Sequence, residues 1–370
     1  MVPESKIRRV VGCMTGTSID GIDAALVEIT GVGLHMRATL VRSVSRPLGS
    51  LSTPLRRLAD QHPMTAGDIA QISHAFSILH RDTMIELLRG ERADLISIHG
   101  QTVWHAPPTS WQMLTPAVIA HALHTPVVSD LRAADLATGG QGAPITPLAD
   151  FVLFRDTVEP RTILNLGGFC NFTWLPAVPR DAADLATYAR QITGGDICAC
   201  NHLLNGVARS ALGCEYDRDG AVAATGRPSD ALVREICARL AAQSRARRSL
   251  GSGDELLAWL DELLRQEPAA NVLRATCEAI AATIAAAAPT AQRVIVGGGG
   301  THNRTLLDAL TRHAKCPVEP CTRHGVEVGQ REAAEMAILG ALCQDRIPIT
   351  LSSVVNATDD RPIAGQWTLP

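Results

Sequence analysis

Residues 12–26 read GCMTGTSIDGIDAAL, and the interpretation of the chain starts from this stretch. Short apolar runs flank it, so strand, glycine-rich turn and strand together predict a β-hairpin. Gly16 and Gly21 lack a Cβ and would let a ligand approach the backbone closely. Free N–H groups and the hydroxyls of Thr17 and Ser18 suit phosphate oxygens. An ordinary glycine-rich hairpin is the alternative, because short glycine motifs recur by chance.

Two carboxylates of the same stretch, Asp20 and Asp23, are candidate ligands of Mg²⁺. Mg²⁺ retains much of its water shell in proteins, so one or two carboxylates are enough to hold it beside a phosphate. The alternative is that both acids are merely solvated.

Length and composition narrow the class of protein. A chain of 370 residues exceeds one ordinary core, which predicts two domains. The net charge of −3 and the 3% aromatic content argue against a nucleic-acid surface. We expect neither a signal peptide nor a membrane span, and therefore a cytoplasmic protein. The ten scattered cysteines indicate reduced thiols, and the C-x-C pair at 198 and 200 is a poor metal motif.

Periodicity predicts most of the regular elements. Strands are expected within 7–50, at 95–98, at 127–128, in a second glycine hairpin at 161–176, and at 292–296. Helices are expected at 66–90, 115–123, 271–288 and 331–343, and from about 201. Residues 217–260 look polar and irregular. The similarity between the hairpins at 12–26 and 161–176 indicates a weak internal repeat.

Polar residues follow two of the predicted strands. The sequence His99-Gly100-Gln101-Thr102 comes directly after residues 95–98, where open α/β sheets collect ligands. Its donors and acceptors suit a polyhydroxylated substrate, although they could equally satisfy local backbone. The spacing of His99 and His105 lacks a partner for a metal site.

The next polar group is Asp130, Arg132 and Asp135, before the glycine-rich sequence GGQGAP at 139–144. Arg132 could hold a substrate carboxylate, or it could form a buried ion pair with Asp135. Glycine absorbs backbone rotation, so residues 139–144 are the expected interdomain hinge.

The second half carries three further candidates. The turn Gly167-Gly168 could contact phosphates, as the first hairpin could. Asp196 precedes a predicted helix and could be a general base or only a helix cap. Four glycines at 297–300 follow a strand and favour a flat ligand such as adenine or ribose.

In series, these stretches resemble the anhydro-N-acetylmuramic acid kinase family of the actin/Hsp70/sugar-kinase superfamily. The similar segments are GCMTGTSIDGIDAAL, SIHGQTVWHAP, TPVVSDLRAADLATGGQGAPITP, ILNLGGFCNFT, YDRDGAVAATG, RRSLGSGDE and VIVGGGGTHN. They span residues 12 to about 342 in the order of the family. Each segment is weak alone, but HGQT, GGQGAP and the opening hairpin in series are specific.

The resemblance implies an α/β fold with two actin-like, ribonuclease H-like duplicated lobes and the nucleotide in the cleft between them. The expected lobes are 1–138 and 139–350, with the tail 351–370 packing back on the first. It also implies a reaction in which 1,6-anhydro-N-acetylmuramic acid, water and ATP give N-acetylmuramic acid 6-phosphate during cell-wall recycling. Mg²⁺ and a homodimer are implied as well.

The resemblance assigns roles to individual residues. Asp196 takes the position of the catalytic aspartate, and Thr102, Arg132 and Glu332 those of the sugar-binding groups. The nucleotide and phosphate positions are Gly16, Thr17, Ser18, Asp20, Gly21, Asp23, Gly167, Gly168, Gly297, Gly298 and Gly299, with Asp20 and Asp23 on the metal.

One segment departs from the family. The usual DTGPGN after the catalytic acid is DICACN here, from Asp196 to Asn201. Losing both glycines and the proline restricts backbone approach to a ligand. The alternatives are therefore an amino-sugar kinase with another substrate and a non-catalytic nucleotide-binding regulator. An Hsp70-like chaperone would need a peptide-binding domain, which the segments do not contain.

Overall fold

The computed structural model describes residues 7–16, 18–245, 250–251, 253–355 and 362–370. The chain forms two compact units. The first contains the described residues up to Leu153, Ala183–Arg190, and those from Gly325 onward. The second contains Phe154–Ala182 and the described part of Gln191–His324.

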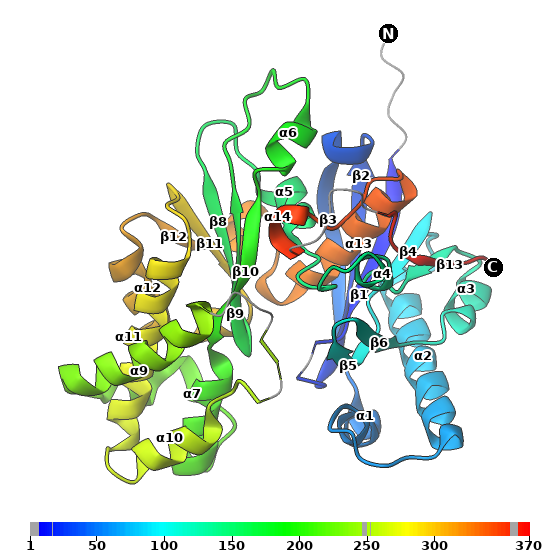
Figure 1. Cartoon of the computed structure of the whole chain (residues 1–370). Coiled ribbons are helices and arrows are strands. Elements are labelled where there is room, and N and C mark those ends of the chain that lie inside the picture. The colour runs from blue at the N-terminus through cyan, green and yellow to red at the C-terminus, as the bar shows by residue number, and fades with distance from the viewer. Residues whose placement is uncertain (1–6, 17, 246–249, 252, 356–361) are drawn as a thin grey trace. The chain divides into compact units, whose positions relative to one another are not determined.

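A six-stranded sheet forms the centre of the first unit (Figure 1). Its strands are β1 (Arg8–Met14), β2 (Gly21–Thr30), β3 (Arg37–Pro47), β4 (Leu95–Ile98), β7 (Val127–Ser129) and β13 (Gln366–Thr368). The spatial order is β13-β7-β4-β1-β2-β3. β1, β2 and β3 form an antiparallel meander. β4 runs parallel to β1, and β7 runs parallel to β4. β13 pairs with β7 in the antiparallel direction.

Two helices pack on opposite faces of this sheet. α2 (Ala66–Leu88) starts with a capping box between Thr65 and Asp68 and buries Phe76 against the β1 face that carries Val11. α13 (Arg331–Gln344) packs on the other face of β1, because alternate strand residues point to opposite sides. The smaller helices are α1 (Ser52–Ala59), α3 (Ala117–Leu123), α4 (Ala133–Ala137), α5 (Pro147–Phe154), α6 (Leu185–Ala189) and α14 (Ser352–Val355).

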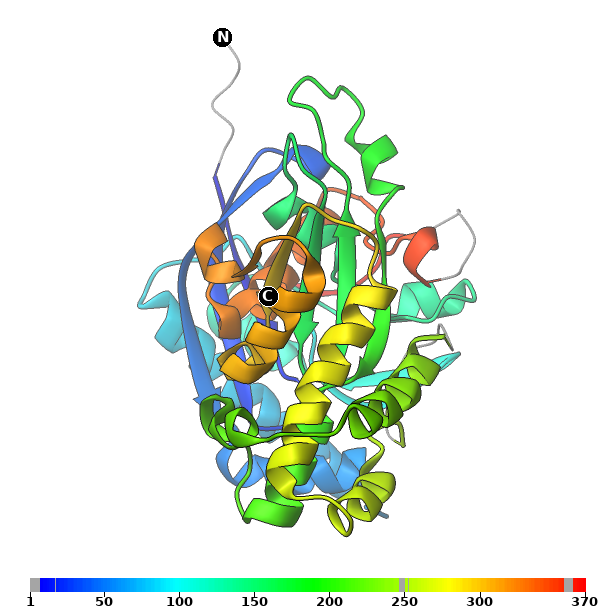
Figure 2. The same cartoon turned by 90° about the vertical axis from the view of Figure 1, so that its left-hand side faces the viewer.

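A five-stranded sheet forms the centre of the second unit. Its strands are β8 (Arg161–Leu166), β9 (Phe169–Leu175), β10 (Thr193–Ala199), β11 (Arg293–Gly297) and β12 (Val318–Pro320), in the order β10-β9-β8-β11-β12. The helices are α7 (Asn201–Val207), α8 (Ala221–Thr225), α9 (Asp230–Arg245), α10 (Leu257–Leu264), α11 (Ala269–Ala287) and α12 (Arg304–Ala314). The alanine-rich α11 packs between α9 and α12, as Figure 2 shows in yellow.

The two sheets share one topology. In each, the first three strands form an antiparallel meander, and the next two add in parallel on the other side of the first strand. The expected α/β class and the duplicated plan are therefore confirmed. The hairpins at 12–26 and 161–176 occupy equivalent places, β1–β2 and β8–β9, in the two sheets.

The structure differs from the sequence expectation in three places. Residues 217–260 include α8, α9 and α10 rather than an irregular link, because Leu232, Ile236 and Leu240 form a buried stripe at helical spacing. Residues 101–113 form a two-stranded hairpin of β5 (Gln101–Ala106) and β6 (Thr109–Met113). Residues 139–144 lie inside the first unit, not at its border.

The lobe boundaries expected at 138 and 350 remain predictions. By packing, the first unit continues to Leu153 and recovers the chain from Gly325, because α13 contributes to its core. Most of the ten cysteines are buried. In the part of the chain that the structure describes, no helix is both long and apolar enough to cross a membrane.

Candidate active site

The β1–β2 turn presents accessible backbone in the first unit. A Cβ at Gly16 would meet only the Ser18 hydroxyl, at 3.5 Å, so its backbone is open. Ile19 has φ +53°, a left-handed conformation that costs a β-branched residue about 1–2 kcal/mol. Ser18 is exposed, and its carbonyl accepts a 2.9 Å hydrogen bond from Arg56. Thr17, the other predicted hydroxyl, lies outside the described residues.

The two predicted metal ligands have different surroundings. Asp20 is exposed at the end of the turn. Asp23 lies within β2 and accepts hydrogen bonds from Ser45 at 2.5 Å and from Gln330 at 3.3 Å. Burial raises the pKa of Asp23, and the Ser45 hydrogen bond partly opposes this. The described residues contain no group of three or more His, Cys, Asp or Glu side chains that could hold a metal. Asp20 fits a hydrated Mg²⁺ better than Asp23 does.

The His99 imidazole orients Arg132. Arg132 Nε donates to His99 Nε2 at 2.9 Å, and Arg132 Nη1 donates to the Gly142 carbonyl at 3.2 Å. Burial, followed by the charge of Arg132, lowers the pKa of His99 to about 3, so His99 is neutral and can accept this bond. The sequence pattern did not indicate that these two residues touch.

The glycine-rich segment packs tightly on Asp135. The Asp135 carboxylate accepts a 2.7 Å hydrogen bond from the Gly142 N–H. A Cβ at Gly140 would lie 2.1 Å from Asp135 Oδ2, so only glycine fits there. Local packing therefore accounts for these glycines, and the same turn places the Gly142 carbonyl against Arg132.

Gln101 connects the HGQT segment to the phosphate turn. It is fully buried, and its Nε2 donates to the Thr102 carbonyl at 3.2 Å and weakly to the Gly16 carbonyl at 3.4 Å. The half-buried Thr102 accepts a 3.3 Å hydrogen bond from Gln112 on β6. The first unit thus brings together the turn at Gly16, the HGQT segment and Arg132.

Glu332, the last predicted sugar group, lies on the first turn of α13 beside a buried ion cluster. Arg331 Nη1 contacts Asp150 at 2.9 Å and Glu335 at 2.7 Å, and all three are at most 3% exposed. Burial raises the pKa of Glu335, and Arg331 opposes this. The cluster holds the start of α13, and hence Glu332, in place. Sequence reasoning missed Asp150 and Arg331.

In the second unit the start of α7 binds the Gly167-Gly168 turn. The N–H groups of Cys200 and His202 donate to the Gly168 carbonyl at 2.8 and 3.1 Å, and the Asn201 N–H donates to Gly167 at 3.1 Å. A Cβ at Gly168 would lie 2.3 Å from the His202 ring. These N–H groups are thus occupied by protein.

Asp196 lies on β10 and remains partly exposed. Its Oδ2 accepts a 2.7 Å hydrogen bond from the Leu250 N–H. The next four residues, Ile197 to Cys200, are fully buried in the core of the unit. The Ala199 N–H donates to Gln243 at 2.9 Å. In the DICACN sequence, the residues that differ from the family are therefore core side chains that directly follow Asp196.

The glycines at 297–300 also have packing roles. A Cβ at Gly298 would lie 2.7 Å from Asn165 Oδ1, and a Cβ at Gly300 would lie 2.7 Å from Leu166 Cβ. Gly299 is exposed and Gly297 ends β11. Contact with β8 thus explains two glycines without a ligand, and it leaves the Gly299 backbone accessible.

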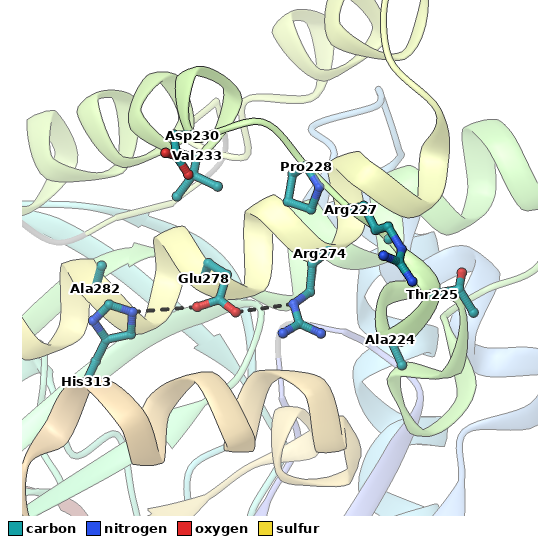
Figure 3. A pocket seen from close by; sticks show the side chains of 11 residues that line it. Ala224, Thr225, Arg227, Pro228, Asp230, Val233, Arg274, Glu278, Ala282 and His313 are labelled. Carbon is teal, nitrogen blue, oxygen red and sulfur yellow. Dashed lines mark hydrogen bonds and ion pairs between the residues drawn. The ribbon is translucent and has the colours of Figure 1, made fainter.

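A cavity of about 700 Å³, which sequence reasoning missed, lies among α8, α9, α11 and α12 of the second unit (Figure 3). Glu278 lines this cavity, and its carboxylate pairs with Arg274 at 3.2 Å, with His313 at 3.6 Å, and with Arg312. The lining includes neither Asp196 nor the glycines at 297–300.

Comparison with known proteins identifies relatives of this chain. Residues 8–366 match the family model described as anhydro-N-acetylmuramic acid kinase. The protein of that name from Acidiphilium cryptum (strain JF-5) is 33% identical over 371 residues, covering 96% of each chain. The one from Prochlorococcus marinus (strain MIT 9303) is 31% identical, covering 90% of this chain and 92% of the relative.

Likeness to solved structures is weaker. The activator of the 2-hydroxyisocaproyl-CoA dehydratase from Clostridium difficile with bound ADPNP is 12% identical, with a TM-score of 0.44. The match covers 90% of this chain and 94% of that one. The sequence relatives alone therefore decide the assignment.

Proposed function

Because the chain belongs to the anhydro-N-acetylmuramic acid kinase family, we propose that it phosphorylates 1,6-anhydro-N-acetylmuramic acid at O6 with ATP. Water attacks the anomeric carbon, the C1–O6 bond breaks, and O6 takes the γ-phosphoryl group. The products are N-acetylmuramic acid 6-phosphate and ADP. The chain is a phosphotransferase with an alcohol acceptor, acting in cell-wall recycling.

The observation that carries the proposal is the exposure and orientation of the Asp196 carboxylate. Its carboxylate is partly exposed, and the Leu250 N–H holds Oδ2 in one orientation. The residues that depart from the family point into the core instead. Asp196 accepts the proton of the attacking water, and such general-base assistance contributes ~10²–10⁴ in rate.

The first unit supplies the sugar contacts. Arg132 is held by His99 and Gly142, and a guanidinium fixed in this way is suited to the lactyl carboxylate. Thr102 and Glu332 complete the sugar-binding set. Holding the sugar rigidly matters, because orientation alone can lower a barrier by about 7–11 kcal/mol.

The β1–β2 hairpin positions the phosphates, and the glycine segment after β11 lies at the adenosine part. The open backbone at Gly16 and the Ser18 hydroxyl hold phosphate oxygens, and Gly299 contacts the adenosine part. Asp20, with Asp23 behind it, would hold a hydrated Mg²⁺, which neutralises phosphate charge when bound. Phosphoryl transfer needs mainly such positioning and charge stabilisation.

The test is mass spectrometry of the product formed from 1,6-anhydro-N-acetylmuramic acid, ATP and Mg²⁺ in ¹⁸O-labelled water. We expect a 6-phosphorylated sugar with the label on the anomeric carbon. Asp196→Asn should lower kcat by ~10²–10⁴, because its amide oxygen keeps the Leu250 hydrogen bond but is not a base. Asp308→Asn, at an exposed carboxylate on α12, is the matched control.

Two alternatives predict other products. A kinase for another amino sugar would phosphorylate a different member of a panel of anhydro and open-ring amino sugars. A nucleotide-binding regulator would bind ATP and phosphorylate none of them. Label at O6 rather than at the anomeric position would exclude the proposed attack of water. The expected homodimer is part of the proposal and is tested by sedimentation.

A further inference from the structure

The two strands of the β5–β6 hairpin are labelled in Figure 1. One face of this hairpin is polar and is organised around Ser110. The Ser110 hydroxyl donates to the Trp104 carbonyl at 3.2 Å. The same oxygen lies 2.9 Å from His105 Nδ1 and 2.8 Å from Gln112 Nε2. Gln112 Nε2 also donates to the Thr102 hydroxyl at 3.3 Å. The network therefore joins Thr102, Gln112, Ser110 and His105 in series.

We assign the tautomer of His105 from this network. The Ser110 hydroxyl lies within hydrogen-bond distance of both the Trp104 carbonyl and His105 Nδ1, and with its single proton on Trp104, His105 Nδ1 donates to Ser110. The His105 Nε2 atom then carries a lone pair and accepts. Burial, followed by the charge of Arg132, lowers the pKa of His105 to about 4, so the imidazole stays neutral at neutral pH.

Gln112 is left with an unused acceptor in the same way. Both protons of its amide go to Ser110 and Thr102. Its Oε1 is buried and has no hydrogen-bond partner among the described residues, and the same holds for His105 Nε2. Buried acceptors without partners are rare in proteins, because each loses its hydrogen bonds to water.

Both acceptors belong to the hairpin that contains Thr102, a proposed sugar contact. The charge of Arg132 acts on both His99 and His105, which places the cation close to this face. The Thr102 hydroxyl accepts from Gln112, so its own proton is directed elsewhere and can be donated. The hairpin thus offers two acceptors and one donor beside a cation.

We propose that His105 Nε2 and Gln112 Oε1 accept hydrogen bonds from two donors of the substrate, an amide N–H and a ring hydroxyl. The hairpin then selects an N-acetylated anhydro sugar that also carries a carboxylate for Arg132. This inference rests on the proposed function, and it assigns specificity to two residues outside the sugar-binding set of Thr102, Arg132 and Glu332.

The test measures binding of three anhydro sugars by calorimetry, without nucleotide. One is 1,6-anhydro-N-acetylmuramic acid, one its 2-O-acetyl analogue, in which an ester oxygen replaces the amide N–H, and one its 4-deoxy analogue. The wild type should bind each analogue roughly 10-fold more weakly or worse, because each leaves a buried acceptor unpaired.

Variants then locate each hydrogen bond. Gln112→Leu and His105→Asn should each weaken binding of the parent sugar and lose discrimination against one of the two analogues. Asn keeps a donor for Ser110 but has no atom at the Nε2 position, whereas His105→Gln can place an oxygen there and should restore binding. In kinetics with ATP, KM should rise roughly 10-fold with kcat nearly unchanged.

Trp111→Phe is the matched control, since Trp111 lies on β6 between Ser110 and Gln112 and so points to the opposite face. Wild-type enzyme that binds the parent and both analogues equally would overturn the inference. So would variants that keep full discrimination. Because binding is measured without phosphoryl transfer, a wild type that binds selectively but transfers no phosphate would refute the proposed function and leave this inference standing.

Discussion

Gly12→Ala tests whether α13 packs on β1 as the structure shows. A Cβ at Gly12 would lie 1.9 Å from the Ala333 carbonyl oxygen and 2.3 Å from the Ala337 backbone nitrogen. Both distances are more than ~1 Å below the ~3.5 Å of an ordinary contact. The colliding atoms are backbone, so a rotamer change cannot relieve the overlap and α13 must move away from the sheet.

The expected cost follows from this geometry. Overpacking a core typically costs about 1–3 kcal/mol, and displacement of a buried helix belongs at or above the top of that range. Thermal unfolding should shift by roughly 2–4 °C for each kcal/mol. The KM for the sugar should also rise, because α13 carries Glu332.

Gly67→Ala is the control, at an exposed position of α2 where the added Cβ would meet only Thr65 Oγ1 at 3.8 Å. It should stabilise the protein by at most about 0.5–1 kcal/mol through helix propensity, because Gly67 lies in the first turn of α2. Scanning calorimetry of both variants measures their shifts in thermal unfolding relative to wild type. A Gly12→Ala variant as stable as wild type would refute the packing of α13 on β1.

Arg132→Lys should raise the sugar KM about 10-fold or more and leave the ATP KM unchanged, because lysine cannot hydrogen-bond to both His99 and Gly142. Equal effects on both KM values in steady-state kinetics would contradict this role. Below about pH 6.5, stability should fall as pH falls toward 3, since the unfolded chain protonates His99 and the folded one does not. Melting measured against pH checks this, and His99→Gln should reduce the slope without removing it, because the pKa values of His80 and His105 are also lowered. Ile197→Ala should destabilise the second unit by about 2–5 kcal/mol, whereas Cys214→Ala, which changes an exposed thiol, should not. Equal denaturation midpoints for the two variants would show that residue 197 is not in the core.

The sequence was sufficient for features that depend on neighbouring residues. Helical spacing located α2, α11 and α13, and glycine between apolar runs located the β1–β2 and β8–β9 hairpins. The motifs in series also indicated the family, which the relatives confirm. α9 was missed because its buried stripe is sparse within polar residues, although Leu232, Ile236 and Leu240 carried the signal.

The meaning of the glycines depended on the tertiary structure. Gly140 is explained by Asp135 nearby in the chain, but Gly12 is explained by α13 and Gly298 by the end of β8. A glycine in a sequence shows only that a Cβ is absent. Whether a ligand or a packed backbone fills that space depends on segments that lie far apart in the chain.

The same reasoning applies to the candidate site. Asp196, Arg132 and Thr102 could be named from motifs, because the residue types and their order are local information. The bond from Arg132 to His99 and the unpaired acceptors of His105 and Gln112 could not, because they depend on how β4, β5, β6 and α4 come together. Spacing along the chain determines which elements form, whereas the protonation and orientation of a side chain depend on the neighbours that folding brings to it.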